Sequence, residues 1–515
     1  MYTDANTPTD FCEDLTEKYL SISDASYRKK HGQYFTPKKI ALFMSDMLTN
    51  HFPKNIKLLD PGAGVGILSC AFCERISKEK QIETIQIDAY ELDNKLRYYL
   101  RQAYEYTKEY LLEKNIQLEY HIHKTDFILS TAHTLKKNNN SKYDLEIINP
   151  PYFKIAKDDE RAKLNSEFVH GQPNIYFLFM AVSAKLLNES GQFVSITPRS
   201  FTSGQYFRQF RKEFFKLVQP EHVHVFESRK DAFKNQSVLQ ENIILKGRKD
   251  SKNQKVKISV SNGGGDLTHF SEQFVPLNRI LIKVNNKDIL FRLPQNKDDL
   301  HILDIVDGWE SNLTSLGLNI STGPVVPFRA TEFLKETNVG AESLVPLLWM
   351  ENIKPMEIMW PYQNNGKKKP KLIINNAQTR KKKLLVKNSN YVLLRRFGPK
   401  EQKKRLVAAP LFKDDMESSY YGFENHVNYI YRINGELSII ESLGLSALLN
   451  SSIVDKYFRI SNGNTEVGAT EIKNLSLPSI RHINAIGEKI HHKKNVSDEE
   501  IDSIVLNAIE SKTNT

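Results

Sequence analysis

Short apolar runs alternate with longer amphipathic stretches along the first half of the chain. An apolar run of about four to eight residues is typical of a buried strand, whereas apolar residues three or four positions apart over a longer stretch are typical of a helix. Strands and helices that alternate in this way predict βαβ units around a mostly parallel, doubly wound α/β sheet. The expected strands are 56–60, 85–91, 120–125, 143–149, 192–197 and 222–226, and the expected helices include 66–77, 94–113 and 175–187.

The composition changes near the middle of the chain. Residues 247–265 (GRKDSKNQKVKISVSNGGG) are rich in Lys, Asp, Asn, Ser and Gly, which predicts a linker or a surface hairpin. A length of 515 residues is enough for two or more domains. We therefore expect one domain over residues 1–250 and a second over residues 251–515.

Charge indicates the kind of partner. The chain holds 72 Lys and Arg against 61 Asp and Glu, a formal net charge of +11, which suits a polyanion such as nucleic acid or an anionic membrane surface. Residues 367–405 hold 15 Lys or Arg and one acid, Glu401, so this tract alone carries 15 − 1 = +14. A charged run is often only a solvated face. Its self-repulsion nevertheless favours neutralisation by phosphates.

The cysteines and the start of the chain bear on compartment and metal binding. Three cysteines cannot form a disulfide framework, and the polar start lacks a signal peptide, so we expect a cytoplasmic protein. No run of 18 or more apolar residues occurs, so no membrane span is expected. Cys70 and Cys73 have no second pair, which favours packing over metal or redox chemistry. The histidines show no metal-ligand spacing either, and no metal is expected.

A glycine-rich turn follows the first expected strand. The sequence Gly62-Ala63-Gly64-Val65-Gly66 lets the backbone turn sharply and approach a ligand in front of a helix N-terminus. Such turns bind many nucleotides and also occur as plain tight turns.

Acidic residues at the strand ends add weight to the nucleotide interpretation. Asp60 ends the first strand, Glu91 ends the second, and Asp126 with Phe127 follows the third. In doubly wound folds an acid at the carboxyl end of a strand binds ribose hydroxyls. This order predicts a nucleoside site, with Asp126 and Phe127 at the edge and face of an adenine.

The fourth expected strand leads into Asn149-Pro150-Pro151-Tyr152. Two prolines cannot continue a central strand, so the chain leaves the sheet there, and a rigid loop is one interpretation. The quartet also suits a specific reaction. The Asn149 side-chain oxygen and the Pro150 carbonyl can each accept one hydrogen of an aromatic amine and so aim its lone pair at an electrophilic methyl group, while Tyr152 stacks on the base.

These motifs, in this order, resemble the gamma-class DNA adenine-N6 methyltransferases of bacterial restriction–modification systems. The segment 31–37 (HGQYFTP) resembles the family's N-terminal cofactor motif, DPGAGVG its glycine motif and NPPY its catalytic motif. The segments 174–180, 198–208, 227–245 and 424–477 resemble modification methylases of the PstI and BsuBI type. One departure is Asp60, because many members have an aromatic residue there.

The resemblance implies a seven-stranded Rossmann-like methyltransferase sheet followed by a mixed α+β DNA-recognition domain. It implies S-adenosylmethionine as cofactor, and the residues expected to bind it are Tyr34, Thr36, Pro37, Asp60, Gly62, Gly64, Gly66, Glu91, Asp126, Phe127 and Asn149. Asn149, Pro150, Pro151 and Tyr152 are expected to carry out catalysis. Tyr152 and Phe233 are expected to stack on the two faces of a flipped adenine, although Phe233 could equally be packed in the core.

The expected partners follow from the same resemblance and from the basic tract. We expect double-stranded DNA as substrate, a separately acting restriction endonuclease in the same system, and a monomeric enzyme. The residues expected to bind DNA are Lys367, Lys368, Lys369, Lys381, Lys382, Lys383, Arg395 and Arg396.

Two alternatives keep parts of this interpretation. A methyltransferase of the same fold can act on RNA or on protein glutamine, but such enzymes are generally compact, and the long basic second half favours DNA. A catalytically silent DNA-binding specificity protein has no chemical reason to keep the intact NPPY quartet.

Overall fold

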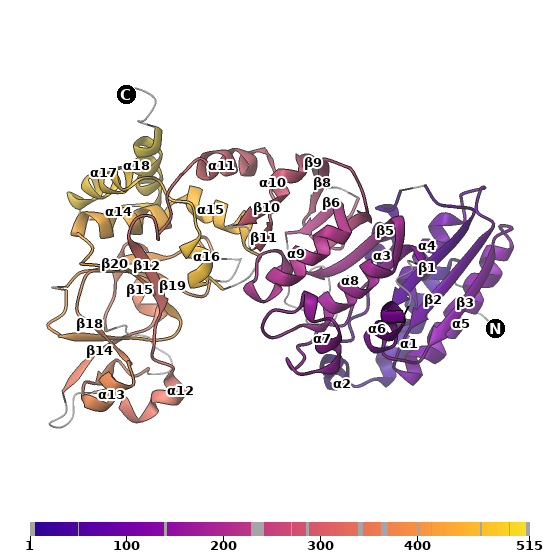
Figure 1. Ribbon diagram of the computed structural model, residues 1–515, viewed down its shortest axis with the longest axis horizontal. Coiled ribbons are helices and arrows are strands. Elements are labelled where there is room, and N and C mark those ends of the chain that lie inside the picture. Colours follow the sequence, from indigo (N-terminus) through magenta and orange to yellow (C-terminus); the bar gives the residue numbers. More distant parts are fainter. Residues whose placement is uncertain are drawn as a thin grey trace. The chain divides into compact units, whose positions relative to one another are not determined.

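The computed structural model describes two compact units, shown in Figure 1. Unit 1 comprises Met1–Asn296 and Ser461–Gly463, and unit 2 comprises Lys297–Ile460 and Asn464–Thr515. The described residues are 6–49, 51–137, 142–227, 241–268, 270–284, 288–337, 343–361, 369–398, 402–413, 415–463, 466–493 and 495–510.

A nine-stranded mixed sheet forms the centre of unit 1, in the order β3-β2-β1-β4-β5-β7-β6-β8-β9. The strands are β1 (Asn55–Pro61), β2 (Thr84–Tyr90), β3 (Gln117–His123), β4 (Tyr143–Ile148), β5 (Leu187–Pro198), β6 (Val218–Phe226), β7 (Asn242–Lys249), β8 (Lys255–Ser261) and β9 (Ser271–Pro276). Strands β1 to β5 pair in parallel, whereas β7 is antiparallel to both of its neighbours, β5 and β6. All six expected strands are present.

The sheet is larger than the seven strands expected, and the expected linker is wrong. Residues 247–265 contain the end of β7 and the whole of β8, which pairs in parallel with β6 and antiparallel with β9. Val256, Ile258 and Val260 alternate along β8 and are buried. This two-residue period, hidden between polar flanks, is the signal of a strand. The boundary between the units consequently falls after Asn296 rather than near residue 250.

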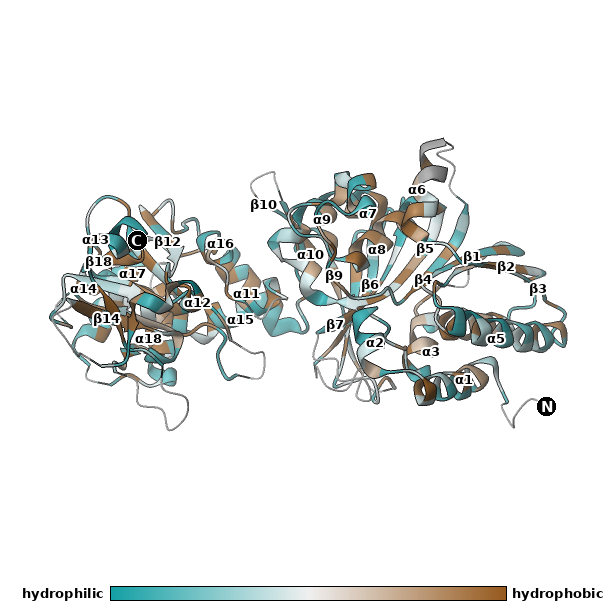
Figure 2. Ribbon diagram, turned by 90° about the horizontal axis from the view of Figure 1, so that it is seen from below, coloured by the Kyte–Doolittle hydropathy of each residue, from teal (hydrophilic) through white to brown (hydrophobic). Residues whose placement is uncertain are grey.

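Helices cover both faces of this sheet (Figure 2). One face carries α1 (Pro8–Ile22), α3 (Lys38–Asp46), α4 (Ile67–Ile76) and α5 (Asn94–Leu112), which pack on one another. The other carries α6 (Phe127–Lys137), α8 (Ile175–Leu186) and α9 (Arg208–Leu217). The remaining elements of unit 1 are α2 (Ala25–Lys30), α7 (Glu160–Leu164), α10 (Leu277–Ile280), β10 (Leu281–Val284) and β11 (Asp288–Phe291). Covered on both faces, the parallel strands have the near-continuous apolar runs seen in the sequence.

Unit 2 combines short, mostly antiparallel strands with helices. A four-stranded sheet has the order β12-β22-β19-β20 and a five-stranded sheet the order β13-β17-β14-β21-β18. The strands are β12 (Leu318–Thr322), β13 (Leu334–Lys335), β14 (Leu344–Leu348), β15 (Ile353–Lys354), β16 (Glu357–Ile358), β17 (Leu372–Ile374), β18 (Leu385–Lys387), β19 (Tyr391–Arg395), β20 (Ala408–Leu411), β21 (Tyr420–Phe423) and β22 (Val427–Arg432). The helices are α11 (Lys297–Asp307), α12 (Pro327–Ala330), α13 (Ala377–Lys381), α14 (Ile439–Asn450), α15 (Ser452–Ser461), α16 (Ala469–Lys473), α17 (Ile480–His491) and α18 (Asp498–Glu510).

The described residues hold neither a membrane-spanning helix nor a group of metal ligands. No helix there combines the length and the apolar character that crossing a membrane requires. In the same residues, no three His, Cys, Asp or Glu side chains are grouped so as to hold a metal ion. The three cysteines are buried free thiols.

Candidate active site

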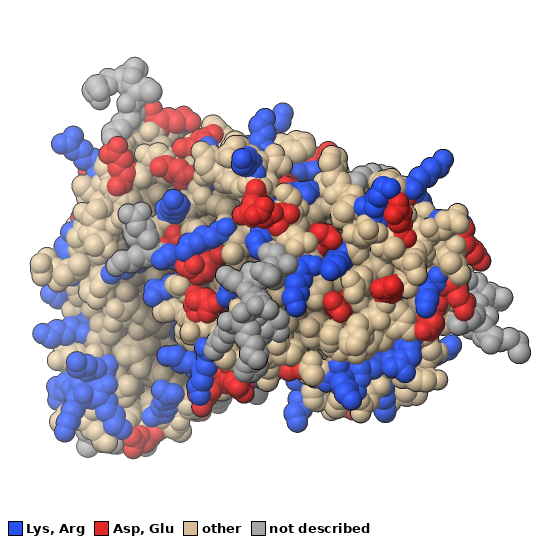
Figure 3. All heavy atoms as spheres, turned by 45° about the vertical axis from the view of Figure 1, so that its right-hand side comes forward, with Lys and Arg blue, Asp and Glu red and all other residues tan. Residues whose placement is uncertain are grey.

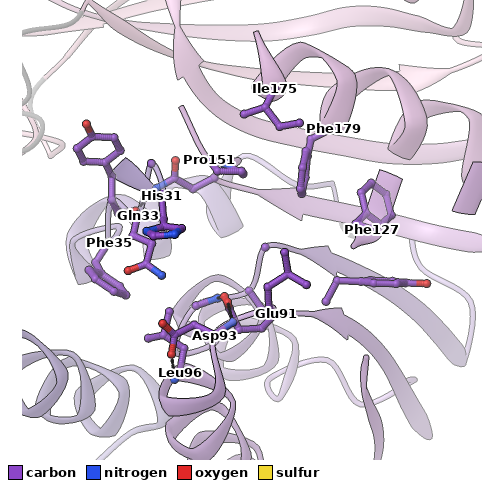
Figure 4. Close-up of a pocket in the computed structure, with 18 of the residues that line it drawn as sticks. His31, Gln33, Phe35, Glu91, Asp93, Leu96, Phe127, Pro151, Ile175 and Phe179 are labelled. Atoms are coloured by element: carbon purple, nitrogen blue, oxygen red, sulfur yellow. Dashed lines mark hydrogen bonds between the residues drawn. The ribbon is translucent and has the colours of Figure 1, made fainter. Parts of the chain in front are cut away.

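A cavity of about 440 Å³ lies in unit 1, where β1, β2 and β4 end. These three strands are parallel neighbours, so their carboxyl ends meet at one edge of the sheet, the usual position for a ligand in an α/β fold. Figure 4 shows side chains that line it from the segment before α3, the ends of β2 and β4, α6 and α8: His31, Gln33, Phe35, Glu91, Asp93, Phe127, Pro151, Ile175 and Phe179.

The glycine turn forms the floor of the cavity. Gly62 and Gly64 line it, with φ of +78° and +60°, a conformation that favours glycine. Gly66 lies behind the cavity and caps α4. A Cβ atom there would come within 2.7 Å of Leu100 Cδ1, so this glycine allows α4 to pack against α5.

Glu91 is tied to that turn by its carboxylate. One oxygen accepts the Gly64 N–H at 2.9 Å, and the other accepts the Asp93 N–H at 2.8 Å. Burial raises the pKa of Glu91 to about 7. The side chain lines the cavity, so Glu91 presents a positioned hydrogen-bond acceptor to any ligand there.

Asp60, which the sequence placed in the cofactor site, does not line the cavity. Its carboxyl group is buried and accepts a hydrogen bond from the Ser69 hydroxyl, with the Tyr104 hydroxyl 3.5 Å away. Burial raises its pKa to about 7. Asp60 therefore belongs to a buried polar cluster between β1, α4 and α5.

Aromatic rings form the opposite end of the cavity. Phe127 lies edge-on to Tyr90 at 5.0 Å between ring centroids, and 5.3 Å from Phe179. Asp126 also lines the cavity and forms an ion pair of 3.5 Å with Arg161 of α7.

Sequence analysis missed Tyr90, Phe179 and Arg161 among these lining residues. Phe179 and Ile175, which also lines the cavity, are four residues apart on α8, so a helical reading of the segment 174–180 could have paired them. Nothing in the sequence places Arg161 beside Asp126.

The Asn149 amide is held from the side of the N-terminal segment. Its nitrogen donates to the Tyr34 carbonyl at 2.9 Å and to the Thr36 hydroxyl at 3.0 Å, which uses both amide hydrogens. Its oxygen lies 2.5 Å from the Tyr152 hydroxyl. The structure therefore brings the segment 31–37 and the NPPY quartet together.

Tyr152 is buried behind Asn149. Its ring stacks on Tyr34 at 5.5 Å, and its hydroxyl also reaches the Ile196 carbonyl at 2.9 Å. Burial raises the pKa of this phenol well above its usual range. One hydroxyl hydrogen can serve only one acceptor at a time, so Tyr152 donates to Asn149 or to Ile196.

Not all of the expected site residues reach the cavity. Those that line it are Tyr34, Thr36, Gly62, Gly64, Glu91, Asp126, Phe127, Asn149 and Pro151. Those that do not, although the structure describes them, are Pro37, Asp60, Gly66, Pro150 and Tyr152. Phe233 lies outside the described residues.

The basic tract of unit 2 divides into exposed and internally bound cations. Lys381, Lys382 and Lys383 are exposed at the end of α13. Arg395 instead donates to the Ile353 carbonyl, and Arg396 makes two hydrogen bonds to the Glu466 carboxylate.

Described cations at the two ends of the basic tract are also partly buried or paired within the protein. Lys404 is buried and bound to Asp498 at 2.7 Å, and Arg405 is buried as well. Lys369 lies over the Trp349 ring at 4.6 Å. Lys367 and Lys368 lie outside the described residues. The +14 of the tract is therefore only partly exposed.

The sheet, the glycine turn and the carboxylate at the end of β2 define an α/β protein with a cavity for a nucleoside-containing ligand. Comparison with known proteins then gives the family. Residues 37–233 match the Eco57I restriction-modification methylase family. The Type II methyltransferase M.PstI of Providencia stuartii is 33% identical over 480 residues, 93% of each chain. The Type II methyltransferase M.BsuBI of Bacillus subtilis is 33% identical over 498 residues, 96% of this chain and 97% of the relative.

A solved structure extends the likeness to the fold. The Type IIL restriction-modification enzyme MmeI in complex with DNA has a TM-score of 0.55 and 12% identity, covering 97% of this chain and 72% of that one. The chain belongs to the family of Type II restriction–modification methyltransferases of the PstI and BsuBI type, and its cofactor is S-adenosylmethionine.

The cavity fits this cofactor. It offers a partly buried carboxylate for hydroxyl groups, a glycine-rich turn for close backbone approach, and aromatic faces for a purine.

Proposed function

We propose that the protein is a site-specific DNA methyltransferase that transfers a methyl group from S-adenosylmethionine to the N6 amine of adenine in duplex DNA, as the modification enzyme of a restriction–modification system. The observation that carries this proposal is the fixed orientation of the Asn149 amide. Both of its hydrogens are bound by Tyr34 and Thr36, so its oxygen is the atom left for an incoming donor.

The reaction needs such an acceptor because an exocyclic amine is a poor nucleophile while its lone pair is delocalised into the ring. The Asn149 oxygen and the Pro150 carbonyl each accept one amine hydrogen, which directs the nitrogen lone pair out of the ring plane. S-adenosylmethionine, when bound, supplies an electrophilic methyl group. Positioning and polar preorganisation provide the rate, and no titrating base is required.

Tyr152 leaves the Asn149 oxygen available to the substrate. When the hydroxyl donates to the Ile196 carbonyl, the Asn149 oxygen is free to accept from the target amine. The alternative acceptor keeps the buried phenol satisfied in either state, so the exchange leaves no buried donor unpaired.

The cofactor is held by residues at the strand ends. We assign Glu91 to its ribose hydroxyls, Asp126 and Phe127 to its adenine, and the Gly62–Gly64 turn to close backbone contact. The partly buried carboxylate of Glu91 and the ring of Phe127 in the cavity wall support these roles.

Duplex DNA hides the amine within the base stack, so the adenine must be extruded into the site, at a cost of a few kcal/mol. Tyr152 and Phe233 are proposed to contact the extruded base, since stacking contributes roughly 1–3 kcal/mol per base. The proposal also includes a restriction endonuclease that acts separately in the same system, and a methyltransferase that acts as a monomer.

The test is to express the chain in a host without adenine methylation and to sequence its DNA by a long-read method that detects modified bases. We expect N6-methyladenine at one recurring sequence, confirmed by mass spectrometry of the nucleosides. Methylcytosine instead would overturn the choice of base. Methylation confined to RNA or to protein glutamine in the same host would overturn the choice of substrate.

A further inference from the structure

One phenylalanine of unit 2 is far more exposed than its chemistry favours. Phe328 on α12 is 77% exposed, the highest fraction of any large apolar side chain in the described part of the chain. The neighbouring Arg329, also exposed, lies with its guanidinium carbon 5.3 Å from the centre of the Phe328 ring. A single exposed apolar side chain is common on protein surfaces, so the support and the surroundings of this ring decide its significance.

The segment that carries Phe328 is held rigidly. Upstream of it, the Gly323 N–H donates to Val427 at 2.7 Å and the Val325 N–H to Phe423 at 3.0 Å. A Cβ atom on Gly323 would lie 2.5 Å from the carbonyl oxygen of Phe423, the last residue of β21, so the loop packs closely against this strand.

On both sides of Phe328 the chain is anchored by core contacts. Val325, Ala330 and Phe333 are buried in one apolar cluster with residues of β14 and β17. Pro327 begins α12 with a φ already suited to a helix. Phe328 is therefore exposed on a fixed support.

Cations of the basic tract lie beside this support. Lys382 places its ammonium group 4.6 Å from the centre of the Phe333 ring and pairs with Glu332 at 3.0 Å. The segment that carries Phe328 continues into β13, and β13 pairs antiparallel with β17, which belongs to the basic tract. A capping box at Asn376 and Thr379 fixes the start of α13, the helix that carries Arg380 and Lys381.

The picture agrees with these contacts. Lys and Arg side chains gather at the lower left of Figure 3, the end of unit 2 at which Figure 1 labels α12 and α13. The exposed residues Phe328 and Arg329 of α12 are thus carried by the same end of unit 2 as the exposed lysines of α13.

We propose that Phe328 and Arg329 contact the bases of duplex DNA, while Lys381, Lys382 and Lys383 hold the phosphates around them. This inference rests on the proposed function, because it names the part of the chain that reads the DNA. A cationic surround attracts a polyanion, and lysine contacts to phosphate set the register without reading sequence. An apolar ring can contact a thymine methyl group or enter a base step, and an arginine can bind a guanine edge, so this pair can supply sequence information.

The experiment measures the affinity of each enzyme for two DNA duplexes. One contains the DNA sequence that the wild-type enzyme methylates, and the other has the same bases in scrambled order. The variants are Phe328→Ala and Arg329→Gln. The matched controls are Phe274→Ala, which removes a 64% exposed ring on β9, and Lys456→Gln, which removes an exposed charge on α15. All four sites are exposed, so the variants are expected to fold, and circular dichroism with thermal unfolding of each full-length variant checks that they do.

We expect Phe328→Ala and Arg329→Gln each to reduce the ratio of specific to non-specific affinity about tenfold or more. Both controls should leave that ratio unchanged. Phe328→Ala removes no charge, so its slope of log affinity against log salt should equal that of the wild type.

Wild-type discrimination in both variants would overturn the inference and leave the proposed function intact. If the two control variants lost as much discrimination as Phe328→Ala and Arg329→Gln, the inference would be overturned as well. If the wild-type chain methylates no DNA, the proposed function itself fails, which is a separate result from either of these.

Discussion

The Glu91 carboxyl group lines the cavity and has a pKa raised to about 7. Two backbone N–H groups stabilise its charged form, yet burial outweighs them and raises its pKa to about 7. Ribose hydroxyls donate hydrogen bonds, so the ionised carboxylate is the better acceptor. The nearby Asp93 carboxylate also raises this pKa, although it contributes less than burial does.

We therefore expect the affinity for S-adenosylmethionine to increase with pH through about 7. If only the ionised form binds, the dissociation constant should fall about tenfold from pH 6 to pH 8 and then level off. Glu91→Gln should bind more weakly and lose this dependence, as calorimetry at several pH values would show. Asp60→Asn is the control, because Asp60 has a pKa raised to the same value but does not line the cavity. If Asp60→Asn, rather than Glu91→Gln, flattened the profile, Glu91 would not be the ribose acceptor.

Asn149 should act on the rate and not on binding. Asn149→Ala removes an acceptor that is used most strongly as the amine becomes tetrahedral, so kcat should fall about 100- to 1,000-fold. Single-turnover methylation and calorimetry separate the two effects. Retention of near wild-type kcat in this variant would contradict the amine-positioning mechanism.

Thr36 provides a second test at the same site. Thr36→Val removes the hydroxyl that binds the Asn149 amide, and should lower kcat by about tenfold, whereas Thr36→Ser should restore it. An equal loss of rate in Thr36→Ser would mean that Thr36 acts only through packing.

The position of a side chain could be predicted from the sequence where its place on a strand determines its direction. Glu91 follows β2 and Asn149 follows β4, the two parallel neighbours of β1. Their place at the carboxyl edge of the sheet could therefore be predicted. Asp60 follows the same rule along the chain but points into the protein, because Ser69 and Tyr104 offer it partners there. Those partners come from two other helices, and their approach depends on packing that no local pattern reveals.

At the scale of elements, the end of α13 tests the electrostatic part of the DNA interface. Replacing Lys381, Lys382 and Lys383 together by Gln should weaken DNA binding, and the slope of log affinity against log salt should decrease by up to about three. Affinity for S-adenosylmethionine should not change. Fluorescence anisotropy over a salt series measures the slope.

A matched control comes from exposed lysines of unit 1. Lys80, Lys108 and Lys114 are exposed on or near α4 and α5, and replacing them by Gln removes the same charge. The same reduction in slope in both triple variants would show that only net charge matters and that the end of α13 is a solvated surface.

The elements themselves were predictable in unit 1 and less so in unit 2. Long apolar runs flanked by amphipathic helices identified β1 to β6, whereas β8 was concealed by its lysines and serines. The position of β7 between β5 and β6 depends on pairing over a long sequence separation. Strands of two to five residues, such as β13 and β17, are too short to show a period, so the sheets of unit 2 could not be drawn from sequence.

For the whole molecule, the chain passes between the units more than once. It leaves unit 1 after Asn296, and Ser461–Gly463 return to unit 1 before the chain continues in unit 2. In this return segment the Gly463 N–H donates to the Ser203 hydroxyl at 3.1 Å, and Asn462 accepts from that hydroxyl at 2.9 Å. Unit 1 is therefore completed by residues that are distant in sequence, and a fragment ending at Asn296 would lack them.

Gly463 is the residue at which this return can be tested in the full-length chain. A Cβ atom there would lie 2.7 Å from Arg199 Cγ and 2.8 Å from both the Arg199 carbonyl oxygen and the Thr202 hydroxyl. Because two of these three atoms are polar and Arg199 is buried, the surroundings have little freedom to move. Gly463→Ala should therefore lower the free energy of unfolding of unit 1 by roughly 1–3 kcal/mol, the usual cost of overpacking.

Gly265→Ala is the matched control, because a Cβ atom at Gly265, also in unit 1, would meet nothing within 4 Å. Urea unfolding of both variants, followed with and without S-adenosylmethionine, gives the measurement. Saturating cofactor should add stability to each variant by the same amount, about 2.7 kcal/mol at a hundred times Kd, since neither glycine lines the cavity. If Gly463→Ala were as stable as Gly265→Ala, the packing of Ser461–Gly463 would not stabilise unit 1. Unit 1 would then owe its stability to Met1–Asn296 alone.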